Sequence, residues 1–202
     1  MTGEFPEPLR VLVERLSKLP GVGPKSALRM GLTLLKWPEQ ATRELGKSIY
    51  ELRDRLMICQ SCLALADSDP CPICSDPGRS REALCLVSEW DNLLALEQGG
   101  FYKGMYMILG GLLAPLDGVD STGLEIAPLR SRLKRGEVKE LILALGTTLE
   151  AENTSSFIKN LVDREFPGLR VTRLAQGIPL GAEVKYMDRE TLRQSLMFRQ
   201  DL

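Results

Sequence analysis

Hydrophobic positions divide the chain into two parts with different spacing. Over residues 1–58, large aliphatic side chains recur every three or four positions, which is the spacing of helices that bury one face. Two such runs flank a break at Trp37-Pro38, and they consist of Leu9, Leu12, Val13 and Leu16 and of Leu45, Ile49, Leu52 and Leu56. Region 1–55 is therefore predicted to be helical.

From residue 79 onward, short apolar runs alternate with segments of helical spacing. The predicted strands are 83–87, 105–109, 140–145 and 168–174, and the predicted helices between them are 90–98, 123–135 and 153–166. Strands that alternate with helices form a parallel sheet buried on both faces, so this pattern predicts an α/β domain over 79–175. Cys85 falls within the first strand and is expected to be buried.

Ligands bind such sheets at the carboxyl ends of the strands. The residues that follow the first three predicted strands are Ser88 and Glu89, Gly110 and Gly111, and 146–152. Region 176–202 lies beyond the last strand and is predicted to be a tail. Its glycines and prolines indicate a loop, and its spacing indicates a strand at 184–186 and a helix at 191–198.

A glycine-rich turn joins two of the N-terminal helices, in the segment LPGVGPKSALRM. Gly21 and Gly23 supply a tight turn and Pro24 suits the first position of a helix, so the segment predicts a helix-hairpin-helix. Glycines let a DNA strand come close, and the N–H groups at the start of the second helix point toward phosphate oxygens. Lys25 and Arg29 share the face that would meet DNA. The alternative is an ordinary helical hairpin with a solvated basic face.

Charge favours the DNA interpretation without deciding it. The whole chain has a formal net charge of −1, whereas residues 1–58 contain ten lysine and arginine residues against seven acidic ones. The composition, 44% hydrophobic and 26% charged, is typical of a globular protein, and no apolar run is long enough to cross a bilayer. The N-terminus lacks a signal-peptide profile. We therefore expect a cytoplasmic, nucleoid-associated protein with no membrane partner.

Four of the five cysteines form two C-x-x-C pairs, and these are Cys59, Cys62, Cys71 and Cys74. Cytoplasmic thiols stay reduced, so the cluster predicts metal binding in preference to disulfides. The eight-residue link between the pairs is long enough to bring four sulfurs into a tetrahedron, which is the geometry of structural zinc. We expect one Zn²⁺ ion per chain, in a module over 56–78. A redox-active C-x-x-C motif is the less favoured alternative.

The order of these parts resembles the bacterial recombination-mediator family RecR along nearly the whole chain. The matching stretches are LPGVGPKSALRM, the two C-x-x-C pairs, GGLLAPLDG, LEAEN and the tail RLAQGIPLGAEVKYMDRETLRQSL. The resemblance implies a Toprim domain, a Walker-B-like tail in subunit contacts, and self-association from a dimer to a ring-shaped tetramer. It also implies the partners RecO and RecF, and a role in loading RecA recombinase on single-stranded DNA at gaps.

The resemblance to Toprim domains raises the question of catalysis. Catalytic Toprim domains resemble one another in a strand-ending glutamate and an Asp-x-Asp pair, which together hold Mg²⁺. These positions fall at Ser88, Gly146 and Thr148, none of which carries a carboxylate, and the chain contains no histidine to act as a general base. Three acidic residues lie near these positions, and they are Glu89 and, on a predicted loop, Glu150 and Glu152. They are candidates for partner binding or for a weak Mg²⁺ site.

Three hypotheses follow from these features. The favoured one is a non-catalytic recombination mediator that binds single-stranded, duplex or gapped DNA. The main alternative is a Mg²⁺-dependent Toprim nuclease or topoisomerase-like enzyme. The third is an architectural zinc protein that does not touch DNA.

Overall fold

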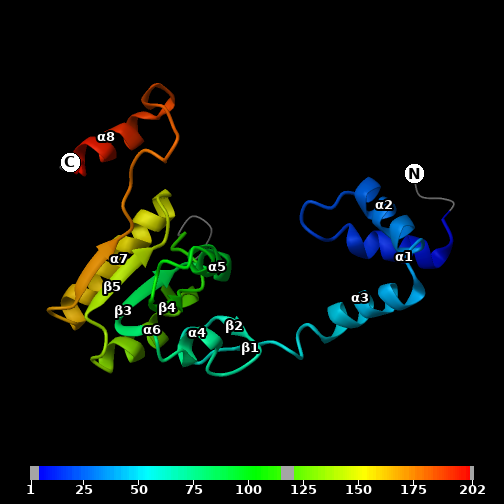
Figure 1. Ribbon diagram of the computed structural model, residues 1–202, viewed down its shortest axis with the longest axis horizontal. Helices are drawn as coiled ribbons and strands as arrows, with labels where there is room; N and C mark the ends of the chain where they lie inside the picture. The colour runs from blue at the N-terminus through cyan, green and yellow to red at the C-terminus, as the bar shows by residue number, and fades with distance from the viewer. Residues whose placement is uncertain (1–4, 115–120, 201–202) are drawn as a thin grey trace. The chain divides into compact units, whose positions relative to one another are not determined.

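The computed structural model describes residues 5–114 and 121–200, apart from the side chain of Ser121. The chain divides into two compact units, Met1–Arg55 and Leu56–Leu202 (Figure 1). Among the described residues, none of the helices combines the length and the apolar character that crossing a membrane requires.

The first unit consists of three helices, α1 (Glu7–Leu16), α2 (Pro24–Leu34) and α3 (Glu39–Glu51). The helical prediction for this region is confirmed, with Pro24 as the first residue of α2. Helices α1 and α2 pack closely because Gly31 has no side chain: a Cβ atom there would lie 3.0 Å from Cδ1 of Leu9. Helix α3 is shorter than its hydrophobic run, because the chain turns after Glu51 and leaves Leu56 outside it.

The second unit contains a sheet of four parallel strands. They are β3 (Ser80–Val87), β4 (Gly104–Ile108), β5 (Glu140–Ala144) and β6 (Arg170–Arg173), in the spatial order β4-β3-β5-β6. The connecting helices are α5 (Trp90–Gln98), α6 (Ile126–Lys134) and α7 (Leu149–Glu165), with a 3₁₀ turn at Ser121–Gly123. The parallel α/β prediction is confirmed, and Cys85 in β3 is only 3% exposed.

The strand order marks one point on the carboxyl edge of the sheet where a ligand would be expected to bind. From β3 the chain moves outward to β4, and from β5 it moves the opposite way to β6. Right-handed crossovers therefore place α5 on one face and α6 and α7 on the other. The carboxyl ends of β3 and β5 lie side by side at this reversal, which is where ligands bind in doubly wound sheets.

The four cysteines lie in a small module over 56–78, which we call the cysteine module. It contains the two-stranded ribbon of β1 (Met57–Ile58) and β2 (Leu65–Ala66), followed by the short helix α4 (Pro72–Ser75). The backbone N–H of Ile108 in β4 donates to the carbonyl oxygen of Cys62 at 2.9 Å. Because β4 is at the edge of the sheet, the cysteine module covers part of that edge.

Two predictions about local structure were wrong. The segment LEAEN is not a loop but the first turn of α7, because the Thr148 side chain caps this helix by accepting from the Ala151 N–H at 3.3 Å. In the tail, the strand expected at Val184–Tyr186 is a 3₁₀ turn, whose backbone bonds are satisfied locally by the preceding residues. The last predicted helix is confirmed as α8 (Arg189–Met197). Part of the GGLLAPLDG run, from residue 115, lies outside the described residues.

Candidate metal centre and nucleic-acid interface

The four predicted metal ligands come together. Their sulfur atoms all lie within 4.8 Å of one another, and the Sγ atoms of Cys62 and Cys71 are 3.5 Å apart, too far for a disulfide bond. Four ligands about 2.3 Å from a central Zn²⁺ ion lie about 3.8 Å apart in a tetrahedron. All four residues are at most 6% exposed. The donor set and its spacing therefore fit a closed, four-thiolate metal site.

Local backbone geometry positions both cysteine pairs. Between β1 and β2 the chain forms a tight turn, in which the Leu63 N–H donates to the Cys59 carbonyl at 2.8 Å and the Cys59 N–H donates to the Ala64 carbonyl at 2.9 Å. Leu63 adopts a positive φ of 64°, which is rare for a leucine and allows the turn to close. In the second pair, Cys71 caps α4 by accepting from the Cys74 N–H.

The electrostatics of the cluster favour a cation at its centre. Burial raises the pKa of the Cys71 thiol to about 11. The pKa of Cys62 is raised by its contact with the Cys74 sulfur and then by burial. Burial also acts to raise the pKa of Cys59, but backbone N–H groups directed at its sulfur outweigh burial and lower it. Four thiolates this close repel one another, so all four ionise together only around a metal ion.

The hairpin turn of the first unit leaves the start of α2 open. Gly21 adopts a φ of +76°, which disfavours other residues, and a Cβ atom on either Gly21 or Gly23 would meet no atom within 4 Å. Gly23 is the N-cap of α2 and offers no side-chain acceptor, and Pro24 has no N–H. Among the described residues, the N–H groups of Lys25 and Ser26 therefore have no acceptor and are open to a ligand. An open helix N-terminus with no side chains around it can accept a phosphate group.

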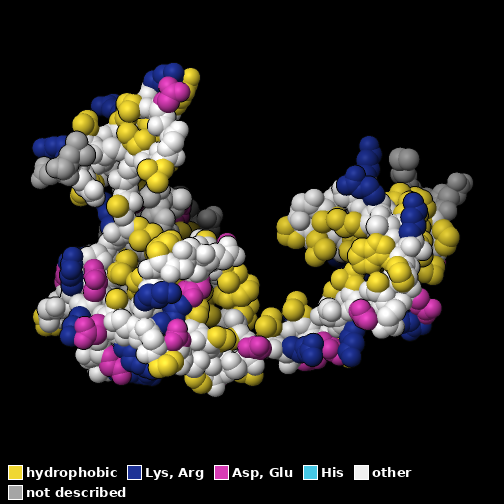
Figure 2. Space-filling model, in the orientation of Figure 1, with side chains coloured by type: hydrophobic (Ala, Val, Ile, Leu, Met, Phe, Trp, Pro, Cys, Tyr) yellow, Lys and Arg dark blue, Asp and Glu magenta, His cyan; other side chains and the backbone are white. Residues whose placement is uncertain are grey.

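Lys25 and Arg29 lie on α2 next to this turn. Both side chains are exposed, and neither has an ion-pair partner among the residues that the structure describes. By contrast, Arg43 and Lys47 on α3 pair with Glu39 and Glu51. Figure 2 shows lysine and arginine side chains that project from the unit over α2. The hairpin thus combines free amides with cations that no carboxylate neutralises.

The three positions predicted from the sequence to correspond to catalytic Toprim carboxylates lie after the carboxyl ends of β3 and β5. Ser88 directly follows β3, is buried, and accepts a hydrogen bond from Nδ2 of Asn92 at 2.8 Å. Gly146 follows β5 with a φ of +97°. Thr148 uses its hydroxyl oxygen to cap α7. None of the three residues has a carboxylate, and the hydroxyl groups of Ser88 and Thr148 both form local hydrogen bonds.

The nearby acidic residues differ in their surroundings. Glu89 is the N-cap residue of α5 and is exposed. Glu150 is exposed in the first turn of α7, and backbone and Thr148 hydrogen bonds hold its pKa below the ordinary value. Glu152 is instead ion-paired with Arg173 at 3.0 Å. Among the described residues, the only group of three or more potential metal ligands is the cysteine cluster.

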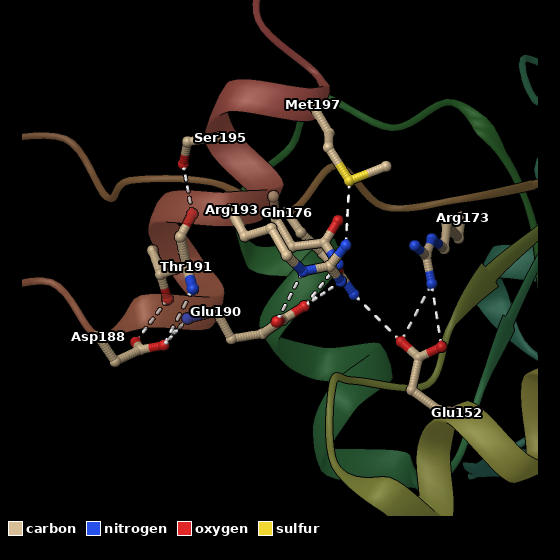
Figure 3. A network of polar contacts seen from close by, with 10 residues as sticks. Glu152, Arg173, Gln176, Asp188, Glu190, Thr191, Arg193, Ser195 and Met197 are labelled. Carbon is tan, nitrogen blue, oxygen red and sulfur yellow. Dashed lines mark hydrogen bonds and ion pairs between the residues drawn. The ribbon is translucent and has the colours of Figure 1, made fainter.

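A polar network around Glu152 was not anticipated from the sequence. Its carboxylate accepts from Nη1 of Arg173 at 3.0 and 3.1 Å and from Nε2 of Gln176 at 3.3 Å (Figure 3). This network borders a polar cavity of about 840 Å³ between the start of α7 and α8. Arg173 and Glu152 are 21 positions apart, and no local pattern marks such a pair. Through Gln176, the network holds the beginning of the tail to α7.

A helix-hairpin-helix unit, a four-cysteine module and a Toprim-type sheet together define a class of DNA-processing proteins. Three family models match the chain: "RecR, helix-hairpin-helix" over residues 9–52, "Toprim domain" over 82–175 and "RecR, C-terminal" over 177–200. Recombination protein RecR of Nitratidesulfovibrio vulgaris is 64% identical and that of Maridesulfovibrio salexigens 59% identical, each over 98% of both chains. That of Moorella thermoacetica is 39% identical over the same share of each chain. The chain belongs to the RecR family of recombination proteins.

Proposed function

We propose that this protein is a non-catalytic recombination mediator that binds DNA through its hairpin. The observation that carries the proposal is the open start of α2, where the Lys25 and Ser26 amides and the cations Lys25 and Arg29 have no partner within the part of the chain that the structure describes. Contacts of this kind are made to phosphates and not to base edges, so binding is independent of sequence. Gaps, single strands and duplexes are all possible ligands, and the hairpin reads none of their bases.

The proposal includes partner proteins at the carboxyl edge of the Toprim sheet. Leu149 is 71% exposed and Trp90 is 40% exposed there, next to the exposed carboxylates Glu89 and Glu150. Exposed apolar side chains ringed by charge are typical of a docking site. We assign this edge to the binding of RecO, and RecF is a further partner. Together with these partners, the protein would help to load RecA on single-stranded DNA at gaps. Glu152 acts on this edge indirectly, because its ion pair with Arg173 holds the start of α7 against the end of β6.

Catalysis is not part of the proposed function. Phosphoryl transfer of the Toprim type uses carboxylates that hold Mg²⁺, and the predicted positions for them are Ser88, Gly146 and Thr148. The cysteine site has the composition of a structural zinc site, and we assign Zn²⁺ to it. Four thiolates leave no open coordination position for water or substrate, so the ion would stabilise the fold and take no part in chemistry.

Self-association is the last part of the proposal. Helix α8 buries none of its residues, and the tail exposes large apolar side chains, namely Leu180, Val184, Tyr186, Leu196 and Phe198. The first unit has an apolar cavity of about 590 Å³ between its three helices. Such surfaces favour a dimer and a ring-shaped tetramer, which would place several hairpins on one DNA molecule and raise the affinity. We place this assembly in the cytoplasm, at the nucleoid.

Fluorescence anisotropy with labelled single-stranded, duplex and gapped oligonucleotides tests the DNA proposal. The double variant Lys25→Ala/Arg29→Ala should bind DNA more weakly and with a shallower salt dependence than the wild type. The matched control is Arg43→Ala/Lys47→Ala, which removes the same charge from paired residues of the same unit. Equal affinity of the hairpin variant and the control would refute DNA binding by the hairpin and would support the architectural alternative.

A further inference from the structure

The amino-terminal edge of the Toprim sheet carries a basic residue at, or next to, the start of every strand. In the spatial order of the strands these residues are Lys103, Arg81, Lys139 and Arg170, which we call the basic edge. Backbone hydrogen bonds join their neighbours: Ser80 N–H donates to the Lys103 carbonyl at 2.8 Å, and Arg170 N–H donates to the Lys139 carbonyl at 3.1 Å. Neighbouring strands lie about 4.8 Å apart, but the register of β3 with β4 shifts between Ser80 and Leu84, so the four residues form an uneven row along this edge.

The members of the row are exposed, and they differ in their pairing. Lys139 pairs with Glu82 at 2.5 Å, and Arg170 lies 3.8 Å from Glu140. Arg81 and Lys103 have no ion-pair partner among the described residues. The exposed end of α6 adds Lys134 and Arg135 next to the start of β5. Figure 2 shows lysine and arginine side chains on the lower border of this unit, where the strands begin, with acidic side chains between them.

The two edges of the sheet therefore differ in charge. The carboxyl edge carries the exposed carboxylates of Glu89, Asp91 and Glu150. Without a bound cation those groups repel a phosphate backbone, whereas the basic edge attracts one. Nucleic acid is therefore expected at the amino-terminal edge of the sheet and not at its carboxyl edge.

We infer that the basic edge is a second DNA-binding surface, which holds backbone phosphates through Arg81 and Lys103. This inference rests on the proposed function, in which the hairpin is the first such surface. The two residues lie at the start of neighbouring strands. Among the described residues neither has a carboxylate partner, so the full charge of both is available to a ligand. Cations that meet phosphates release counterions from DNA, and the surface contributes affinity without sequence preference.

The test compares four proteins by anisotropy with a labelled duplex and a labelled single strand, over a range of salt. They are the wild type, the edge variant Arg81→Ala/Lys103→Ala, the hairpin variant Lys25→Ala/Arg29→Ala and the control Arg43→Ala/Lys47→Ala. Each lost phosphate contact lowers the salt slope for duplex DNA by about 0.9, so the edge variant should lose about 1.8. Between 50 and 200 mM salt, its affinity deficit relative to the wild type should shrink by about 12-fold.

The outcomes separate this inference from the proposed function. If the hairpin variant loses affinity and the edge variant matches the control, the basic edge does not bind DNA and the hairpin does. If only the edge variant loses affinity, the inference stands and the hairpin assignment fails. If neither loses affinity, both are overturned. The charge-conserving variant Arg81→Lys/Lys103→Arg should restore most of the affinity, and unchanged metal content and melting of the edge variant exclude a folding defect.

Discussion

The replacement Cys59→Ser should unfold the cysteine module and uncover the edge of the Toprim sheet. Cys59 is fully buried, and its Sγ accepts a hydrogen bond from the Cys71 N–H at 3.5 Å. Serine places a shorter, harder oxygen where a thiolate belongs. The substitution therefore removes one of the four predicted metal ligands and buries a hydroxyl group in its place.

The expected loss of stability is large. A structural zinc site contributes about 10–16 kcal/mol to folding, so one ligand of four corresponds to about 3–4 kcal/mol. A buried hydroxyl without a good partner costs about 1–3 kcal/mol more. The resulting loss of about 4–7 kcal/mol is comparable with the whole stability of many domains, about 5–15 kcal/mol. The module should therefore lose its metal and its fold.

Three measurements on the full chain check this expectation. Metal content should fall, urea should unfold the variant earlier, and the amide of Ile108 should exchange faster because its acceptor, the Cys62 carbonyl, is lost. Cys85→Ser is the matched control, since Cys85 is equally buried but lies outside the cluster. A Cys59→Ser protein that keeps one metal ion per chain and full protection of Ile108 would refute the reasoning.

Three further predictions concern single groups. Gly21→Ala should destabilise the first unit by about 1–2 kcal/mol because of its positive φ, and Gly23→Ala by less than about 1 kcal/mol, while both weaken DNA binding by anisotropy. Thr154→Val should lower the free energy of unfolding in urea by about 1–2 kcal/mol. The buried Thr154 hydroxyl accepts from the Leu113 N–H at 2.8 Å and donates to the Glu150 carbonyl at 2.6 Å, and valine makes neither bond. An unchanged unfolding midpoint would contradict this. Arg130 lowers the pKa of Glu165 to about 2, so the pair stabilises the fold above the ordinary carboxyl pKa and this contribution is lost as the pH falls toward 2. Arg130→Gln should therefore melt at a lower temperature than the wild type at pH 7. The two melting temperatures should converge in acid.

Features with local signals could be predicted from the sequence. The hairpin turn depends on glycine and proline at fixed positions, and Pro24 begins α2 as expected. The alternation of apolar runs and helical spacing predicted all four strands of the parallel sheet, because their buried parts are almost wholly apolar; β6 is the exception, since it exposes Arg170 and Arg173. The two C-x-x-C pairs predicted the four cysteines that come together.

Features that depend on long-range contacts or on competition between local structures could not be predicted. The pair of Glu152 with Arg173 joins α7 to the end of β6, and neither residue indicates the other. The start of α7 was missed because acidic and polar residues read as a loop, although Thr148 caps a helix there. In the tail, β-branched and aromatic residues favoured a strand, but Val184–Tyr186 forms a local 3₁₀ turn and pairs with no strand of the sheet.

The backbone at Gly146 limits what a carboxylate engineered into this edge of the sheet could do. A φ of +97° is a conformation that residues with side chains rarely adopt, so an aspartate placed there would strain the turn after β5. A single substitution would therefore introduce the carboxylate and distort its position at the same time. Adding acidic residues alone would therefore not build a well-ordered carboxylate site at this turn, because the backbone would have to be reshaped first.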